Sequence, residues 1–130
     1  MVLTKKTNPL LHIILFIIFT NCETIERNCK DFNSGDFYTE TSVNGITYKS
    51  TFSRDGSNIQ IEEFEGKIDS SYVRWVNDCE MILSPINPKK MSEKKNIFIK
   101  ILTTNDSSYT YEYSYLGQSN KLKAKAIRIR

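Results

Sequence analysis

The amino-acid sequence predicts an all-β protein, a small antiparallel up-and-down barrel or half-barrel of about eight strands, preceded by a signal peptide. Short stretches rich in β-branched and aromatic residues follow one another at intervals of about 8–12 residues, which is typical of sandwiches and barrels. Turn-forming residues separate these stretches, and no helical periodicity competes with the alternation. An apolar N-terminal run behind two lysines predicts the signal peptide.

Residues 1–21 have the composition of a secretory signal peptide. Two lysines precede the apolar run from Leu10 to Phe19, which is too short for an ordinary transmembrane helix of about 20 residues. A buried core helix is the alternative. Cys22 follows the run directly, and Phe19-Thr20-Asn21-Cys22 resembles the lipobox of bacterial lipoproteins, whose cysteine is lipidated. We therefore expect Cys22 to anchor the chain to a membrane.

The sequence then divides into the signal peptide over 1–21, a polar tether over 22–28 and a barrel-like domain over 29–130. The formal net charge of +3 includes two lysines of the leader, so the remainder is nearly neutral and does not favour nucleic acid binding. The single histidine, His12, also lies in the leader. A Ser-His-Asp or Cys-His mechanism would therefore lack its base, and we expect no enzyme, no metal site and no cofactor.

Cys29 and Cys79 are expected to form a disulfide. With Cys22 lipidated, these two cysteines are an even pair in an oxidising compartment. Cys79 belongs to a predicted hairpin that turns at Asn77-Asp78 and contains Trp75, the only tryptophan. The bridge would close a loop of about fifty residues and stabilise the fold by roughly 2–4 kcal/mol. A buried free thiol at Cys79, with Cys29 exposed, is the alternative.

The turns define the expected strands. Asn44-Gly45 is a strong hairpin signal, and Asp55-Gly56 and Asn105-Asp106 mark further turns. Pro85 and Pro88 interrupt strand pairing, so we expect a mobile loop over Pro85–Lys95 with a short helical turn from Ser92. The expected strands cover residues 37–41, 47–54, 58–65, 67–77, 79–84, 96–103 and 108–115, followed by a final strand after residue 120.

One predicted strand carries both isoleucines and acidic residues. Ile59 and Ile61 alternate and share a face, whereas Phe64 falls on the other parity, so we expect a bulge near Glu63. Glu62 and Glu63 are adjacent and should point to opposite faces, which makes them a poor catalytic acid–base pair.

Four tyrosines occupy alternate positions of another strand, and therefore share one face. They are either an aromatic platform for a flat ligand or part of the core with their hydroxyls at its rim. A closed core disfavours so many hydroxyls, so one end of this face should reach water. The candidate ligand-binding residues are Tyr109, Tyr111, Tyr113, Tyr115 and Trp75.

The final strand is basic. Its lysines and arginines either contact an anionic surface or protect the exposed edge of a sheet, since edge lysines deter aggregation; we favour the edge strand. The residues concerned are Lys121, Lys123, Lys125, Arg128 and Arg130.

From Cys29 onward the chain resembles small lipoproteins of the Bacteroidetes. The resemblance implies a secreted or membrane-anchored β domain without an established activity. It is carried by Cys29-Lys30-Asp31-Phe32, Gly35, Phe37, Arg54-Asp55-Gly56, Gln60, Glu62, Val73-Arg74-Trp75, Asn77, Cys79, Glu80 and Leu83.

These observations together favour a lipocalin-like barrel on a non-enzymatic envelope lipoprotein, facing the periplasm or the cell surface. We expect it to bind a small apolar ligand or an envelope protein, and not nucleic acid. The alternative is a lysozyme-inhibitor-like protein that acts through the exposed Pro85–Lys95 loop. An apolar interior pocket of about 300 Å³ or more would favour the ligand carrier, and a closed interior would contradict it.

Overall fold

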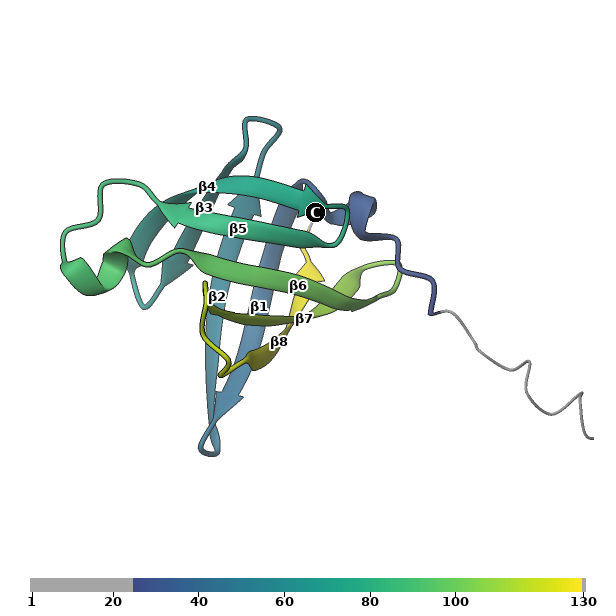
Figure 1. Ribbon diagram of the computed structural model, residues 1–130. Helices are drawn as coiled ribbons and strands as arrows, with labels where there is room; N and C mark the ends of the chain where they lie inside the picture. Colours follow the sequence, from purple (N-terminus) through teal and green to yellow (C-terminus); the bar gives the residue numbers. More distant parts are fainter. Residues whose placement is uncertain (1–24, 130) are drawn as a thin grey trace, which may run out of the picture.

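Eight antiparallel strands close into one barrel in the computed structural model, which describes residues 25–129 (Figure 1). Each strand pairs with the next, and the last pairs with the first, so the barrel is up-and-down and lipocalin-like. The all-β prediction is confirmed, and the barrel is complete rather than half-open. The elements are η2 (Cys29–Phe32), β1 (Gly35–Val43), β2 (Ile46–Arg54), β3 (Ile59–Phe64), β4 (Lys67–Asn77), β5 (Glu80–Pro85), η3 (Met91–Lys94), β6 (Ile97–Thr104), β7 (Ser108–Tyr115) and β8 (Leu122–Arg128).

The signal peptide over 1–21 and the lipidation site Cys22 lie outside the described residues. Within residues 25–129, no helix is long and apolar enough to cross a membrane.

Two hairpins have the two-residue turns that suit the twist of antiparallel strands. Val43 pairs with Ile46, so Asn44-Gly45 alone connects β1 to β2. Both residues have positive φ, at 52° and 78°, as this turn type requires. Glu65-Gly66 connects β3 to β4 in the same way, with φ values of 50° and 77°. Asparagine and glycine adopt positive φ most readily, which explains why the first turn could be predicted from sequence.

The two ends of the barrel differ. The turns between β2 and β3, β4 and β5, and β6 and β7 lie at the end where β1 begins, and η2 covers this closed end (Figure 1). The buried side chains of Phe32 and Phe37 fill it. The β1–β2 and β3–β4 hairpins, the Pro85–Lys95 loop and the β7–β8 connection lie at the opposite, open end.

The Cys29–Cys79 disulfide is confirmed. It joins η2 to the turn between β4 and β5, and the two Cα atoms lie 5.2 Å apart although the residues are 50 positions apart in the sequence. The bridge therefore fixes η2 over the closed end.

The predicted bulge near Glu63 is wrong, because β3 pairs with β2 and β4 without a register shift. The inner face of β3 carries Gln60 and Glu62, and Phe64 has the same parity. Gln60 is only 6 % exposed, whereas Ile61 on the outer face is 46 % exposed. No bulge is needed because the face with the two isoleucines is the outer one.

The basic final strand is not the edge of a sheet, contrary to expectation. β8 pairs with both β7 and β1, because barrel closure leaves no free edge. Ala124 and Ala126 point inward and are buried, while Lys123 and Lys125 are exposed. The Arg128 guanidinium lies 5.1 Å from the centre of the Phe32 ring. Arg130 lies outside the described residues.

Gly35 is expected to be intolerant of substitution. Its φ of 135° is one that side-chain-bearing residues rarely adopt, and an added Cβ would lie 2.8 Å from Arg128 Nη1 and 3.2 Å from the Phe37 ring. We expect Gly35→Ala to lower the free energy of unfolding by about 1–3 kcal/mol, measured by urea denaturation. Gly56→Ala is the control, because nothing lies within 4 Å of a Cβ added there. Equal losses in both variants would contradict this role for Gly35.

Candidate functional site

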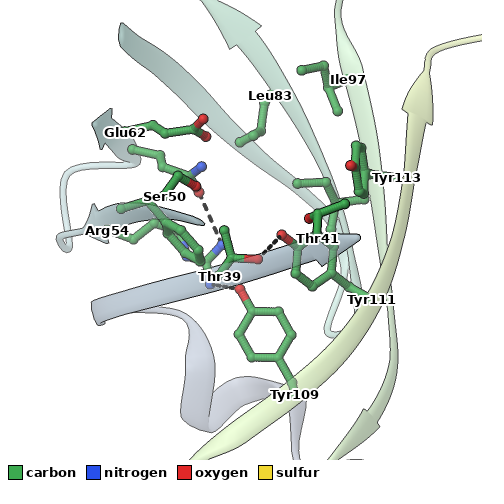
Figure 2. A pocket seen from close by; sticks show the side chains of 13 residues that line it. Thr39, Thr41, Ser50, Arg54, Glu62, Leu83, Ile97, Tyr109, Tyr111 and Tyr113 are labelled. Carbon is green, nitrogen blue, oxygen red and sulfur yellow. Dashed lines mark hydrogen bonds between the residues drawn. The ribbon is translucent and has the colours of Figure 1, made fainter. Parts of the chain in front are cut away.

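The barrel encloses a cavity of about 190 Å³ that is partly open to solvent (Figure 2). Side chains of β1, β2, β3, β5, β6 and β7 line it, and hydroxyl, amide and charged groups alternate with apolar ones. The lining residues are Thr39, Thr41, Ser50, Phe52, Arg54, Gln60, Glu62, Leu83, Ile97, Ile99, Tyr109, Tyr111 and Tyr113.

Arg54 forms the inner end of this cavity, and we call its surroundings the floor. It is only 4 % exposed. Its Nη1 donates to Gln60 Oε1 at 3.2 Å, and its Nη2 donates to the Phe32 carbonyl oxygen at 2.9 Å and to Tyr109 Oη at 2.8 Å. All of these acceptors are uncharged. The Nε of Arg54 is buried and has no hydrogen-bond partner among the described residues.

Aromatic rings complete the surroundings of the Arg54 guanidinium. Its central carbon lies between 5.2 and 5.8 Å from four ring centres, those of Phe37, Phe52, Trp75 and Tyr109. Ring faces attract cations, so the barrel stabilises this buried charge largely without a carboxylate. Trp75, a candidate ligand-binding residue, belongs to this arrangement and packs against the core, but it does not line the cavity.

The tyrosine strand runs from the floor to the open end. Tyr109 and Tyr111 are buried, Tyr113 is partly buried, and Tyr115 is 43 % exposed. The first three line the cavity (Figure 2), whereas Tyr115 lies outside it, with Lys95 Nζ 5.2 Å from its ring centre. The tyrosine face of β7 therefore extends from the buried core to the solvent, as expected.

The two innermost tyrosine hydroxyls remain protonated. Tyr111 Oη lies 3.1 Å from Thr39 Oγ1 within the barrel. Burial raises the pKa of both Tyr109 and Tyr111, although the neighbouring Arg54 partly offsets the increase at Tyr109. Both hydroxyls are therefore neutral hydrogen-bond donors at physiological pH.

Glu62 also lines the cavity, while Glu63 lines a shallow hollow on the outside of the barrel. The expectation that these neighbours point to opposite faces is confirmed. Burial raises the pKa of the Glu62 carboxyl, and the negative charge of Asp69 raises it further. The described residues give Glu62 no ion-pair partner.

Glu62→Gln is expected to change how stability depends on pH. Because the pKa of Glu62 is raised in the folded state, its ionisation opposes folding, and stability falls as pH rises above the usual glutamate pKa of about 4.3. The substitution should remove this fall and make the protein more stable at pH 7, measured by thermal unfolding between pH 4 and 8. Glu63→Gln, on the exposed outer face, should leave the pH profile unchanged, and an identical effect of both variants would contradict the prediction.

The Pro85–Lys95 loop, the candidate inhibitory loop, contains η3 as its short helical turn. Glu93 holds it in place, since its carboxylate accepts from the backbone N–H of Lys89 and Lys90 and pairs with Lys67 Nζ at 3.1 Å. Within residues 25–129, no cluster of three or more acidic, histidine or cysteine side chains could hold a metal ion.

No family model, curated protein or solved structure matches this chain. Its function has to be inferred from the cavity and its lining.

Three of the tyrosines that line the cavity were predicted from sequence, but Arg54, Gln60 and Glu62 were not brought together as a group. A signal was present, because Ser50, Phe52 and Arg54 share one parity of β2. An arginine on the same face as a core phenylalanine must be buried or end the strand. Strand pairing then places Arg54 opposite Gln60 and Phe52 opposite Glu62, which the sequence does not specify.

Proposed function

We propose that this chain is a non-enzymatic, membrane-anchored lipoprotein of the cell envelope whose barrel binds a small ligand in its interior. The observation that supports ligand binding is the partly open interior cavity, which has a polar inner end and an apolar wall. Ligand sites generally combine such an apolar lining with a few convergent polar groups. The apolar wall consists of Leu83, Ile97 and Ile99.

The cavity size limits the ligand. About 190 Å³ is less than the roughly 300 Å³ of the smallest usual drug-sized sites. It exceeds the roughly 150 Å³ of an engineered cavity that binds benzene. The cavity can hold a ligand that has an apolar part of the size of benzene and one small polar group, whereas a long-chain lipid is too large for it. The polar groups of the lining also favour a ligand that is not purely apolar.

The membrane anchor rests on the sequence of the first 22 residues. We expect a fatty-acid probe to label the wild-type protein and not Cys22→Ala when both are expressed in a bacterium with lipoprotein processing. An unlabelled wild type would contradict the anchor without bearing on the cavity.

Ligand binding is tested by native mass spectrometry of the protein isolated from envelopes. We expect a small bound species that disappears in Thr41→Phe, because Thr41 lines the cavity and a ring added there would occupy it. Thr51→Phe is the matched control, since Thr51 is exposed on the outer face. Wild-type protein without any bound species would contradict an interior site. Equal retention of the species in both variants would also contradict it.

A further inference from the structure

Two guanidinium groups lie at the closed end of the barrel, and neither has a carboxylate partner among residues 25–129. The central guanidinium carbons of Arg54 and Arg128 lie 5.2 and 5.3 Å from the centre of the Phe37 ring. Within the described part of the chain, Arg128 donates only to the backbone carbonyl oxygens of Asp31 and Ser34. Among residues 25–129, every ion pair is made by a lysine. Arg54 is buried, whereas Arg128 is only partly buried. Buried charges are normally paired with an opposite charge, so Arg54 gives the floor a positive charge that no ion pair among the described residues compensates.

The hydrogen bonds at the floor also leave donors directed at the cavity. A guanidinium can only donate, so Gln60 Oε1 is the acceptor of the Arg54 bond and the Gln60 NH₂ group is directed elsewhere. No acceptor for that group is present among the described residues. Gln60 lines the cavity, so its NH₂ group is available to a ligand there.

The hydroxyls add further donors. Tyr109 Oη accepts from Arg54, so its own proton is free for another acceptor. In the Thr39–Tyr111 pair one hydroxyl donates to the other, and one proton again remains. Figure 2 shows these side chains converging from β1, β2 and β7. Positive charge and several unused donors at one place are complementary to a carboxylate, which accepts at both of its oxygens.

We propose that the floor binds the carboxylate group of a small ligand whose apolar body packs against Leu83, Ile97 and Ile99. This inference rests on the proposed ligand-binding function and specifies the ligand class. Arg54 supplies the charge, and Gln60 and Tyr109 supply the hydrogen bonds. The apolar body occupies the part of the cavity nearer the open end.

Glu62 determines the orientation of the ligand in the cavity. Gln60 pairs with Arg54 and Glu62 pairs with Phe52, so Glu62 lies about 7 Å nearer the open end along the strand. Its carboxyl group opposes an anion in the outer part of the cavity. A ligand carboxylate is therefore stable only at the floor, beneath Glu62.

The test uses three probes of one shape, benzoate, benzamide and benzylamine, titrated into the full-length protein in detergent. Binding is followed by calorimetry and by the methyl resonances of Leu83, Ile97 and Ile99, which report entry into the barrel. We expect benzoate to perturb these methyl groups and to bind at least about tenfold more tightly than benzamide, since a charged hydrogen-bond partner strengthens binding by more than a neutral one. Benzylamine should be the weakest.

Gln60→Glu is the decisive variant because it keeps the side-chain shape and gives Arg54 an internal carboxylate. It should weaken benzoate binding by about tenfold or more through like-charge repulsion and loss of the amide donors, and benzamide binding much less. Gln118→Glu makes the same change in the exposed β7–β8 connection and should leave benzoate binding unchanged. Glu62→Gln should strengthen it.

The outcomes separate the two proposals. If benzamide or benzylamine enters the barrel as tightly as benzoate, or if Gln60→Glu and Gln118→Glu behave alike, the carboxylate site is wrong and an interior ligand site remains. If none of the three probes perturbs the methyl groups of Leu83, Ile97 and Ile99, both the carboxylate site and the proposed binding function are contradicted.

Discussion

Replacement of both Cys29 and Cys79 by serine is expected to lower the free energy of unfolding by about 4 kcal/mol. The bridge joins residues 50 positions apart, and a loop of that length loses much conformational entropy in the unfolded chain when it is closed. The bridge also holds η2, which contributes the buried Phe32 to the closed end. The measurement is urea denaturation of the wild type and the double variant.

The control for this prediction is a reducing agent. Reductant should shift the unfolding midpoint of the wild type toward that of the double variant and should not affect the double variant. Equal midpoints for the oxidised wild type and the double variant would show that the packing of η2 keeps the closed end covered without the bridge.

Phe37→Ala is expected to lower the free energy of unfolding by about 3–5 kcal/mol. Phe37 is fully buried, and its ring lies 5.1 Å from the Phe52 ring centre and 5.8 Å from that of Tyr109. The guanidinium groups of Arg54 and Arg128 both lie close to its ring centre, at 5.2 and 5.3 Å. The substitution would therefore remove core volume and one of the rings that stabilise two cations.

Phe64→Ala is the comparison for Phe37→Ala in the same denaturation assay. Phe64 ends β3 at the open end, is only partly buried, and its ring contacts that of Tyr48 at 6.2 Å. Phe64→Ala should therefore lower the free energy of unfolding clearly less than Phe37→Ala does. A similar loss in both variants would mean that the closed end is not the main stabilising region of the barrel.

The strands and the disulfide could be predicted from sequence. The strands follow from the local preferences of turn residues, and the disulfide follows from the number of cysteines. Asn44-Gly45 specifies a tight turn by its backbone preferences, and the expected lipidation of Cys22 left Cys29 and Cys79 as an even pair. Closure into a complete barrel depends instead on the pairing of β8 with β1, which are far apart in sequence. The basic residues of β8 therefore resembled those of an edge strand.

The interior polarity was harder to predict. The isoleucines of β3 have the hydrophobic character of a core face, yet Ile61 is exposed and Gln60 is buried. Gln60 is stable inside because it accepts a hydrogen bond from Arg54, and Arg54 is stable because neutral acceptors and aromatic rings surround it. Each residue makes the burial of the other possible, so the parity of Arg54 alone does not predict that Gln60 lies beside it in the interior.

The chain enters the barrel at its closed end, so an anchor at Cys22 would be attached on that side of the barrel. Arg27 Nη1 donates to the Ile101 carbonyl oxygen at 2.9 Å, and the Asn28 backbone N–H donates to Thr104 Oγ1 at 2.9 Å. Both contacts hold the start of the described chain against the end of β6, beside η2. A lipid attached at Cys22 would therefore place the floor toward the bilayer and the entrance toward the aqueous phase. A ligand of the proposed kind would then reach the cavity from the aqueous phase rather than by lateral diffusion from the membrane.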